Sequence, residues 1–320
     1  MVSSSAESSA EEELGTWQAL SGELAAAVER VGKAVVAINA SRRIPSSGVH
    51  WRAGVVVTSA HSIRREEEIT VTLDDGRSVG ATFGGRDPST DLAVLKIEDA
   101  GLPVVETTDA SELRVGQLVL AMGRAGERGA SASLCVVNAL GGAWRTWRGG
   151  EIDKLVRLDI ALYPGFSGGP LITSAGQVAG INSSGLSRSL AVTIPAATVN
   201  RVVERLLERG SIARGYLGVA LSPVRVPDAL VSRLELGGHS GLIVLNVEPD
   251  GPADRAGLLL GDVVIAFNGV PVGEMEDIHS ALGSDSVGRV VRAALIRGGQ
   301  RAELEITVGE RPRRHARHER

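Results

Sequence analysis

The chain has 320 residues, a length that suggests two domains. Hydrophobic residues make up 43% of it and charged residues 22%, which is an ordinary globular composition. The net charge of −4 argues against a nucleic-acid-binding protein, because such proteins usually carry a basic surplus. The single cysteine, Cys135, cannot form an internal disulfide, and its apolar surroundings predict a buried, inert thiol rather than a nucleophile.

Residues 1–15 are rich in serine, alanine and glutamate, and we expect them to form a disordered acidic N-terminus. They lack the basic start and the apolar run of a secretory signal, and no window of the chain approaches the apolar length of a membrane span. We therefore expect a cytoplasmic protein with no membrane-spanning segment. From Trp17 onward, apolar residues recur at spacings of three and four, which predicts a helix that ends at Gly32.

Short apolar segments separated by turn residues follow this helix. A first group of strands is predicted at 34–38, 54–58, 69–73, 77–83 and 92–97. A second group is predicted at 118–122, 134–139, 155–160, 171–173, 178–182 and 190–194. Many short strands at regular intervals indicate a β-barrel or β-sandwich rather than a parallel sheet. Pro195 and an apolar stripe then predict a helix over 195–209, which Gly210 ends.

Beyond a linker at 211–214, the pattern mixes strands with short helices. Strands are predicted at 241–247, 261–269 and 290–297, and helices at 252–258 and 275–282. The strand at 290–297 is predicted to be the last. Residues 310–320 include five arginines and two histidines, and we expect a solvated, disordered basic tail there.

The segment 164–171 places Ser167 between glycines. Such a turn can expose the hydroxyl and aim N–H groups at one point, as acyl transfer requires, although a glycine-rich surface turn has the same pattern. A serine nucleophile also needs a base and an orienting carboxylate. His61 follows one predicted strand and Asp91 precedes another, in the order His, Asp, Ser that chymotrypsin-like proteases use. His50 also precedes Asp91, but it lies in an irregular stretch rather than at a strand end.

Four segments resemble the HtrA/Deg family of serine proteases. They are 58–63, the Asp-Asp-Gly-Arg turn at 74–77, the segment 90–97 with Thr-Asp-Leu-Ala-Val-Leu-Lys, and Pro-Gly-Phe-Ser-Gly-Gly-Pro-Leu at 164–171. The block Ala-Gly-Leu-x-x-Gly-Asp at 256–262 resembles the PDZ domain of that family. The sequence departs from the family pattern at Phe166, where asparagine is usual, and at Ser59-Ala60 before His61. The loop before His61 is also abbreviated.

The resemblance implies a mainly β fold in which a chymotrypsin-like double β-barrel protease domain precedes a small α+β PDZ domain. The protease domain would span 16–210 and the PDZ domain 215–309, with the tail at 310–320. The resemblance assigns His61 as general base, Asp91 as its orienting carboxylate and Ser167 as nucleophile. The N–H groups of Gly165 and Ser167 would be the oxyanion donors.

Two binding regions follow from the same resemblance. The primary specificity pocket would be lined by Leu162, Asn182, Ser183 and Ser184. The PDZ groove would be formed by Tyr216, Leu217, Gly218, Val219, Ile278 and Leu282. An apolar leucine in the specificity pocket favours small to medium apolar side chains before the cleaved bond. No cofactor-binding motif or metal-ligand cluster is present in the sequence, so none is expected.

The resemblance predicts an ATP-independent serine endopeptidase that cleaves unfolded or damaged proteins in protein quality control and stress response. Its PDZ domain would bind peptide C-termini, and a homotrimer would be the assembly. One alternative is a peptide-binding or chaperone-like protein with a latent or inactive protease domain, which Phe166 leaves open. Another is a PDZ scaffold with a dead protease domain, which the intact triad disfavours. We expect the Phe166 ring to pack inward, with the tryptophan-bearing loop 141–150 as a candidate partner.

Overall fold

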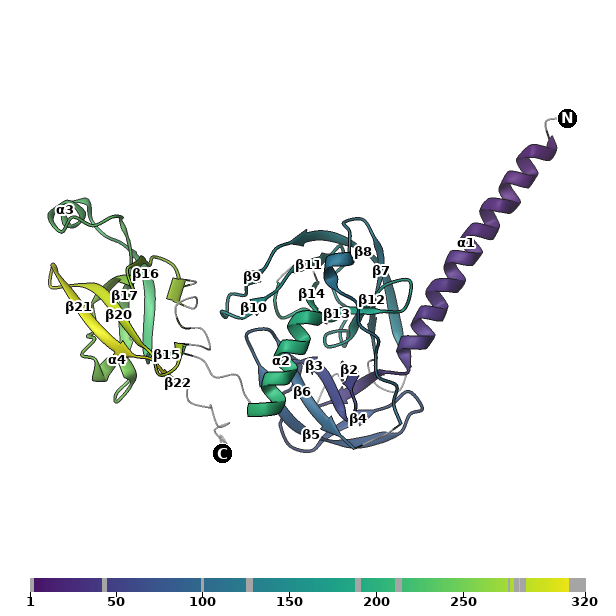
Figure 1. Cartoon of the computed structure of the whole chain (residues 1–320), viewed down its shortest axis with the longest axis horizontal. Coiled ribbons are helices and arrows are strands. Elements are labelled where there is room, and N and C mark those ends of the chain that lie inside the picture. Colours follow the sequence, from purple (N-terminus) through teal and green to yellow (C-terminus); the bar gives the residue numbers. More distant parts are fainter. Residues whose placement is uncertain are drawn as a thin grey trace. The chain divides into compact units, whose positions relative to one another are not determined.

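The computed structural model describes residues 3–41, 45–98, 101–124, 129–187, 191–210, 215–275, 277–278, 282 and 286–310. The chain divides into two units (Figure 1). The first comprises Met1–Thr146 and Gly150–Ser211, and the second comprises Trp147–Gly149 and Ile212–Arg320. The expected basic tail after residue 310 lies outside the described residues.

The first unit begins with a single long helix, α1 (Ser3–Gly32). This corrects the expectation of disorder over 1–15, because the helix already starts at Ser3. The segment contains four glutamates and two alanines, which are strong helix formers, so its composition is compatible with a helix despite its five serines. In the part of the helix whose burial is described, residues 15–32, Ala27 and Val31 near the C-terminal end are buried, whereas Trp17 is 70% exposed. None of the helices in the described part of the chain is both long and apolar enough to cross a membrane.

Six antiparallel strands close the first barrel in the order β1-β2-β3-β6-β5-β4. Their bounds are β1 (Val35–Asn39), β2 (Ser46–Arg52), β3 (Val55–Ser59), β4 (Ile69–Thr72), β5 (Ser78–Asp87) and β6 (Leu92–Ile97). Five of these strands match the predicted group, and β2 was not expected. The polar start of β2 hides its strand character, yet every residue of it except Arg52 is buried. His50 therefore lies within a strand rather than in an irregular stretch.

A second barrel closes in the order β11-β14-β13-β12-β7-β8. Its strands are β7 (Leu118–Gly123), β8 (Ser131–Gly141), β11 (Leu155–Leu158), β12 (Pro170–Ile172), β13 (Val178–Ser183) and β14 (Val192–Pro195). Strands β9 (Trp144–Arg145) and β10 (Glu151–Ile152) form a small two-stranded sheet that does not pair with the barrel strands. These two closed barrels confirm the predicted double-barrel fold.

Helix α2 (Ala196–Arg209) packs against strands of both barrels, β5 and β6 of the first and β13 and β14 of the second. It ends as predicted at Gly210, whose left-handed conformation lets its N–H reach the Leu206 carbonyl at 2.8 Å. Cys135 is buried on β8, and burial raises the pKa of its thiol to about 11. The prediction of a buried thiol is therefore confirmed, and the raised pKa disfavours the thiolate, which is the reactive form.

The second unit is built on a sheet ordered β16-β17-β18-β20-β21, with β19 beside β18. Its elements are β15 (Gly215–Tyr216), β16 (Val219–Arg225), α3 (Asp228–Arg233), β17 (Ser240–Val247), α4 (Pro252–Arg255), β18 (Val263–Phe267), β19 (Val270–Pro271), β20 (Val290–Arg297), β21 (Gln300–Thr307) and β22 (Gly309–Glu310). Neither α3 nor β21 was expected. Strand β21 pairs with β20 along its whole length, so 290–297 is not the last strand.

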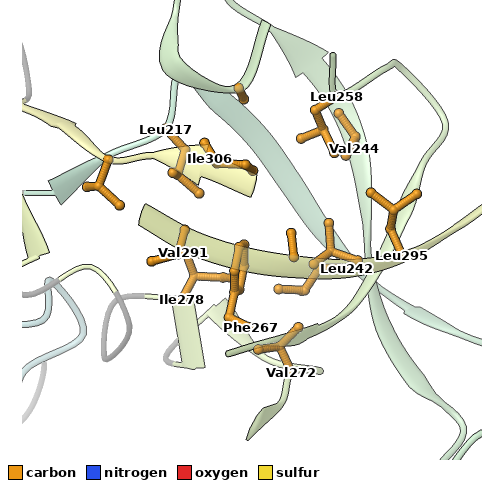
Figure 2. Close-up of a cluster of buried hydrophobic side chains, with 14 residues drawn as sticks. Leu217, Leu242, Val244, Leu258, Phe267, Val272, Ile278, Val291, Leu295 and Ile306 are labelled. Atoms are coloured by element: carbon orange, nitrogen blue, oxygen red, sulfur yellow. The ribbon is translucent and has the colours of Figure 1, made fainter. Parts of the chain in front are cut away.

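The apolar core of this unit gathers around Phe267, with Leu242, Val291 and Ile278 close to it (Figure 2). The predicted helix 275–282 falls partly on residues outside those described. Within it, the Leu282 N–H donates to the Ile278 carbonyl at 2.9 Å, which is helical geometry. Both side chains belong to this core or pack against it.

Candidate active site

His61 and Asp91 lie at the ends of two paired strands of the first barrel. Residue Ser59, the last of β3, is opposite Leu92, the first of β6, and His61 follows in the short 3₁₀ helix η1 (Ala60–Ser62). The His61 Nδ1 lies 2.7 Å from Asp91 Oδ2, and the His61 backbone N–H donates to Asp91 Oδ1 at 2.9 Å. Both carboxylate oxygens therefore hold the same histidine.

Asp91 is only 4% exposed, and it adopts a left-handed backbone conformation (φ +59°) that aspartate tolerates better than most residues. A third donor reaches its carboxylate, since the Ser183 hydroxyl donates to Oδ2 at 2.5 Å. With Nδ1 donating to this carboxylate, the other ring nitrogen of His61, Nε2, is left as the proton acceptor. The His61 side chain is 34% exposed, so a substrate can approach it.

Ser167 lies on the loop between β11 and β12 of the second barrel. Gly165 has φ +92° and Gly168 has φ +86°, conformations that favour glycine. A Cβ at Gly168 would lie 2.2 Å from the carbonyl oxygen of Ser47, so the loop approaches the first barrel too closely for any side chain there. The N–H groups of Gly165 and Ser167 donate to no acceptor within the part of the chain that the structure describes.

The Ser167 hydroxyl is bonded to Ser184. Its Oγ lies 2.8 Å from Ser184 Oγ and accepts from the Ser184 N–H at 3.2 Å. Among the described residues, no hydrogen bond joins it to His61. Ser183 and Ser184 are consecutive residues, and the first bonds Asp91 while the second bonds Ser167. This pair brings the His61–Asp91 couple of one barrel and the serine of the other into a single site.

The residues expected to line a specificity pocket differ in their burial and in their hydrogen bonds. Leu162 is half-buried and packs against the core of the second barrel. Asn182 is fully buried, its amide donates to the Pro170 carbonyl at 2.9 Å, and its Oδ1 accepts from the Thr193 hydroxyl at 2.8 Å. The Asn182 side chain is thus committed inside the barrel, which does not fit a pocket wall.

Ser183 and Ser184 contact the triad residues, a role that sequence reasoning missed. Their position directly after an apolar strand was visible in the sequence, but the partners of their hydroxyl groups lie 92 and 17 residues away. The Ser183–Asp91 contact joins the two barrels and the Ser184–Ser167 contact lies within the second barrel, and neither leaves a local pattern in the sequence.

Phe166 packs inward, as expected, because its side chain belongs to the core cluster of the second barrel and the residue is 7% exposed. Its ring makes an edge-to-face contact with Tyr163, with centroids 5.7 Å apart. Tyr163, rather than loop 141–150, is therefore its aromatic partner in the described structure.

The loop of the PDZ-like unit that was predicted to bind a carboxylate lies at Leu217 and Gly218, between β15 and β16. Their carbonyl groups accept from the N–H of Ala253 at 2.9 Å and of Glu248 at 2.7 Å, and Gly218 has φ +77°. Their own N–H groups have no acceptor among the described residues. The remaining predicted groove residues are Tyr216, whose hydroxyl bonds Glu248; Val219, which begins β16; buried Ile278; and half-buried Leu282.

Comparison with known proteins gives the same two domains. Residues 46–181 match the trypsin-like peptidase domain, and residues 215–308 match the PDZ domain. A "probable periplasmic serine endoprotease DegP-like" of Ectopseudomonas mendocina is 35% identical over 264 residues, which cover 81% of this chain and 55% of the relative. Its counterpart in Halomonas elongata is 34% identical over 276 residues, covering 85% and 57%. The chain thus spans little more than half the length of these relatives.

Solved structures match over nearly all of their length. The serine endoprotease from Yersinia pestis is 31% identical with a TM-score of 0.66, covering 89% of this chain and 97% of that one. The HtrA-type protease AlgW with a decapeptide is 29% identical with a TM-score of 0.67, covering 90% and 99%.

The expectation of a cytoplasmic protein is wrong, because the similar curated proteins are named periplasmic endoproteases. That expectation rested on the lack of a leader pattern in the first residues, and such a lack does not determine a compartment. The domain order and the identity over most of the chain bear out the resemblance seen in the sequence segments. The chain belongs to the HtrA/Deg family of trypsin-like serine proteases with a PDZ domain.

Proposed function

We propose that this chain is a serine endopeptidase in which Ser167, His61 and Asp91 form the catalytic triad. One observation carries the proposal: Ser183, the last residue of β13, hydrogen-bonds Asp91, and the next residue, Ser184, hydrogen-bonds Ser167, so the three groups lie close to one another. The named activity of the similar curated proteins, serine endoproteases, supports it.

In the proposed reaction, Ser167 Oγ bonds to the carbonyl carbon of the substrate while its proton passes to His61 Nε2. Asp91 keeps the histidine in the correct tautomer and stabilises its charged form. The substrate oxygen becomes an oxyanion and accepts from the N–H groups of Gly165 and Ser167. The C–N bond then breaks, and His61 returns the proton to the leaving amine. A water molecule then attacks the acyl carbon while its proton passes to His61. The bond to Ser167 Oγ breaks, and His61 returns the proton to that oxygen. No step of this cycle needs ATP.

We further infer that the PDZ domain binds peptide C-termini. The N–H groups of Leu217, Gly218 and Val219 would receive the terminal carboxylate, and the peptide would add as a strand beside β16, an edge strand of the sheet. A similar protease, AlgW, has been solved with a decapeptide and with a tripeptide. We propose unfolded or damaged proteins as substrates, a homotrimer as the assembly and the periplasm as the compartment.

The alternative, a peptide-binding or chaperone-like protein with a latent or inactive protease domain, is not favoured by relatives that are named endoproteases. The specificity pocket remains a proposal on Leu162, Ser183 and Ser184. An apolar wall there would select small or medium apolar side chains before the cleaved bond.

The decisive test compares the wild-type chain with Ser167→Ala and with Ser131→Ala, which removes an exposed serine of β8. We expect Ser167→Ala to lose cleavage of unfolded casein by a factor of roughly 10⁴ or more, because the triad acts as a unit. Fluorophosphonate labelling should disappear with it, and Ser131→Ala should match the wild type. Robust cleavage by Ser167→Ala would exclude this mechanism.

A further inference from the structure

The strand of the first barrel that meets the nucleophile loop is β2, and Ser47 on it is completely buried. The Ser47 N–H donates to the Ser167 carbonyl at 3.2 Å. The Ser47 carbonyl accepts from the Thr58 hydroxyl at 2.6 Å. Thr58 lies on β3, three residues before His61. The backbone of Ser47 therefore links the strand that leads to the base with the loop that carries the nucleophile.

The Ser47 hydroxyl makes a second connection to the same loop. It accepts from the Arg124 N–H at 2.7 Å and donates to the Gly165 carbonyl at 2.6 Å. These directions are fixed by chemistry, because a backbone N–H can only donate and a carbonyl can only accept. The Ser47 hydroxyl thus donates its single hydrogen to the Gly165 carbonyl.

This bond fixes the peptide unit between Gly165 and Phe166. Its carbonyl is held by Ser47, and its N–H donates to the Tyr163 carbonyl at 3.0 Å. Because the peptide unit is planar, two bonds at opposite sides stop it from rotating. Gly165 has more accessible conformations than any other residue type, so its own N–H direction depends on this restraint.

Ser47 is itself held from behind by Arg124, which is only 2% exposed. The Arg124 guanidinium donates to the Val35 carbonyl at 2.7 Å and to the Gly32 carbonyl at 3.2 Å, and it pairs with the Asp74 carboxylate. These three partners hold the Arg124 side chain in place, and they thereby restrain the Arg124 backbone N–H that donates to the Ser47 hydroxyl.

We propose that Ser47 is a positioning residue for the oxyanion site: its hydroxyl holds the Gly165–Phe166 peptide so that the Gly165 N–H points at the developing oxyanion. The role rests on the proposed endopeptidase function. The Ser47 hydroxyl acts through Gly165 and touches no substrate. Its loss should therefore lower kcat more than it raises KM, because an oxyanion site stabilises the transition state more than the ground state.

The test uses the full chain with a chromogenic peptide substrate and a peptide boronic acid, which forms a tetrahedral adduct on the serine. Ser47→Ala removes the hydroxyl, Ser47→Thr keeps it, and Ser46→Ala is the matched control. Ser46 is also buried on β2, but its hydroxyl has no partner among the described residues. Melting temperatures show that each variant is folded.

We expect kcat of Ser47→Ala to fall at least roughly tenfold, toward the 10²–10³-fold loss of a deleted oxyanion donor, with a parallel loss of boronic acid affinity. Ser47→Thr and Ser46→Ala should stay near the wild type. A smaller fall for Ser47→Ala, or a folded Ser47→Thr that falls as far, overturns the role. If Ser47→Thr does not fold, Ser47→Ala against Ser46→Ala decides. A wild-type chain that neither cleaves the peptide nor binds the boronic acid refutes the endopeptidase proposal, and the role of Ser47 with it.

Discussion

The proposed activity depends on the hydroxyl of Ser167, which hydrogen-bonds Ser184 instead of His61 in this structure. Ser184 offers it both an N–H and a hydroxyl, whereas attack on a substrate requires it to donate to His61 Nε2. Catalytic hydrogen bonds are often long in free enzymes and tighten when substrate binds. Either hydroxyl can donate in the Oγ–Oγ bond, and where Ser167 is the donor, its hydrogen must leave Ser184 before it can pass to His61.

Removing the Ser184 hydroxyl should therefore make the free enzyme more reactive. A neutral hydrogen bond contributes about 1 kcal/mol net, so we expect Ser184→Ala to speed fluorophosphonate labelling by about fivefold. The neighbouring variant Ser183→Ala is the matched control, because it removes a donor from Asp91 and should slow labelling instead. Labelling rates in the absence of any client protein measure both effects. An unchanged or slower rate in Ser184→Ala would show that the bond does not restrain the nucleophile.

At the scale of elements, the loop that carries Ser167 is held by both barrels. Ser47 fixes the loop from the first barrel through Gly165 and Ser167. Phe166 anchors it in the core of the second barrel. The Gly168 N–H also donates to the Asn182 carbonyl at 2.9 Å, which ties the loop to β13. The shape of the loop is thus determined by its contacts with β2, with β13 and with the core of the second barrel, together with its glycines.

The Phe166 anchor predicts a large stability effect. Phe166→Ala should lower the free energy of unfolding by about 3–5 kcal/mol, since it empties a core position. Its ring partner Tyr163 is 64% exposed, so Tyr163→Ala should cost only about 0.5–1.5 kcal/mol for the lost ring contact. Urea unfolding of the two variants measures the difference. Equal, small losses would mean that the ring does not anchor the loop. Whether Phe166 also lowers the basal activity stays a prediction.

At the scale of the whole molecule, the sequence was sufficient to predict those features of the fold and site that depend on a local pattern of residues. His61 and Asp91 stand at the ends of apolar strands, and antiparallel pairing of those strands brings them together. The order of the triad and the glycines around Ser167 then indicated the protease. The start of α1 could not be predicted in this way, because a segment rich in serine and glutamate is compatible both with a helix and with disorder.

Features that depend on two distant segments could not be predicted. Strand β2 has a polar beginning, and its burial is explained only by the loop that accepts the hydrogen bonds of Ser47. The contacts of Ser183 and Ser184 have the same origin. A buried polar residue needs a partner, but the sequence does not say which residue that partner is.

Peptide binding by the PDZ domain can be predicted, and tested, independently of catalysis. In the PDZ domain, the carbonyl groups of Leu217 and Gly218 are occupied, while their N–H groups have no acceptor in the described structure. The Leu217 side chain belongs to the buried core, whereas the neighbouring Val219 and Leu282 are half-buried, apolar and uncharged. A ligand must therefore supply its own acceptor for the N–H groups and an apolar end for the side chains.

We expect a peptide that ends in valine with a free carboxylate to bind the full-length Ser167→Ala chain, which cannot cleave it. Amidation of the C-terminus should weaken binding at least roughly tenfold, because hydrogen bonds to a charged group contribute about 1.5–3 kcal/mol. Replacing the last residue by aspartate should weaken it as well, since a second charge would face an apolar surface. Calorimetric titration of the three peptides gives the dissociation constants. If the amidated peptide binds as tightly as the free acid, the loop at Leu217 and Gly218 is not the site of carboxylate capture.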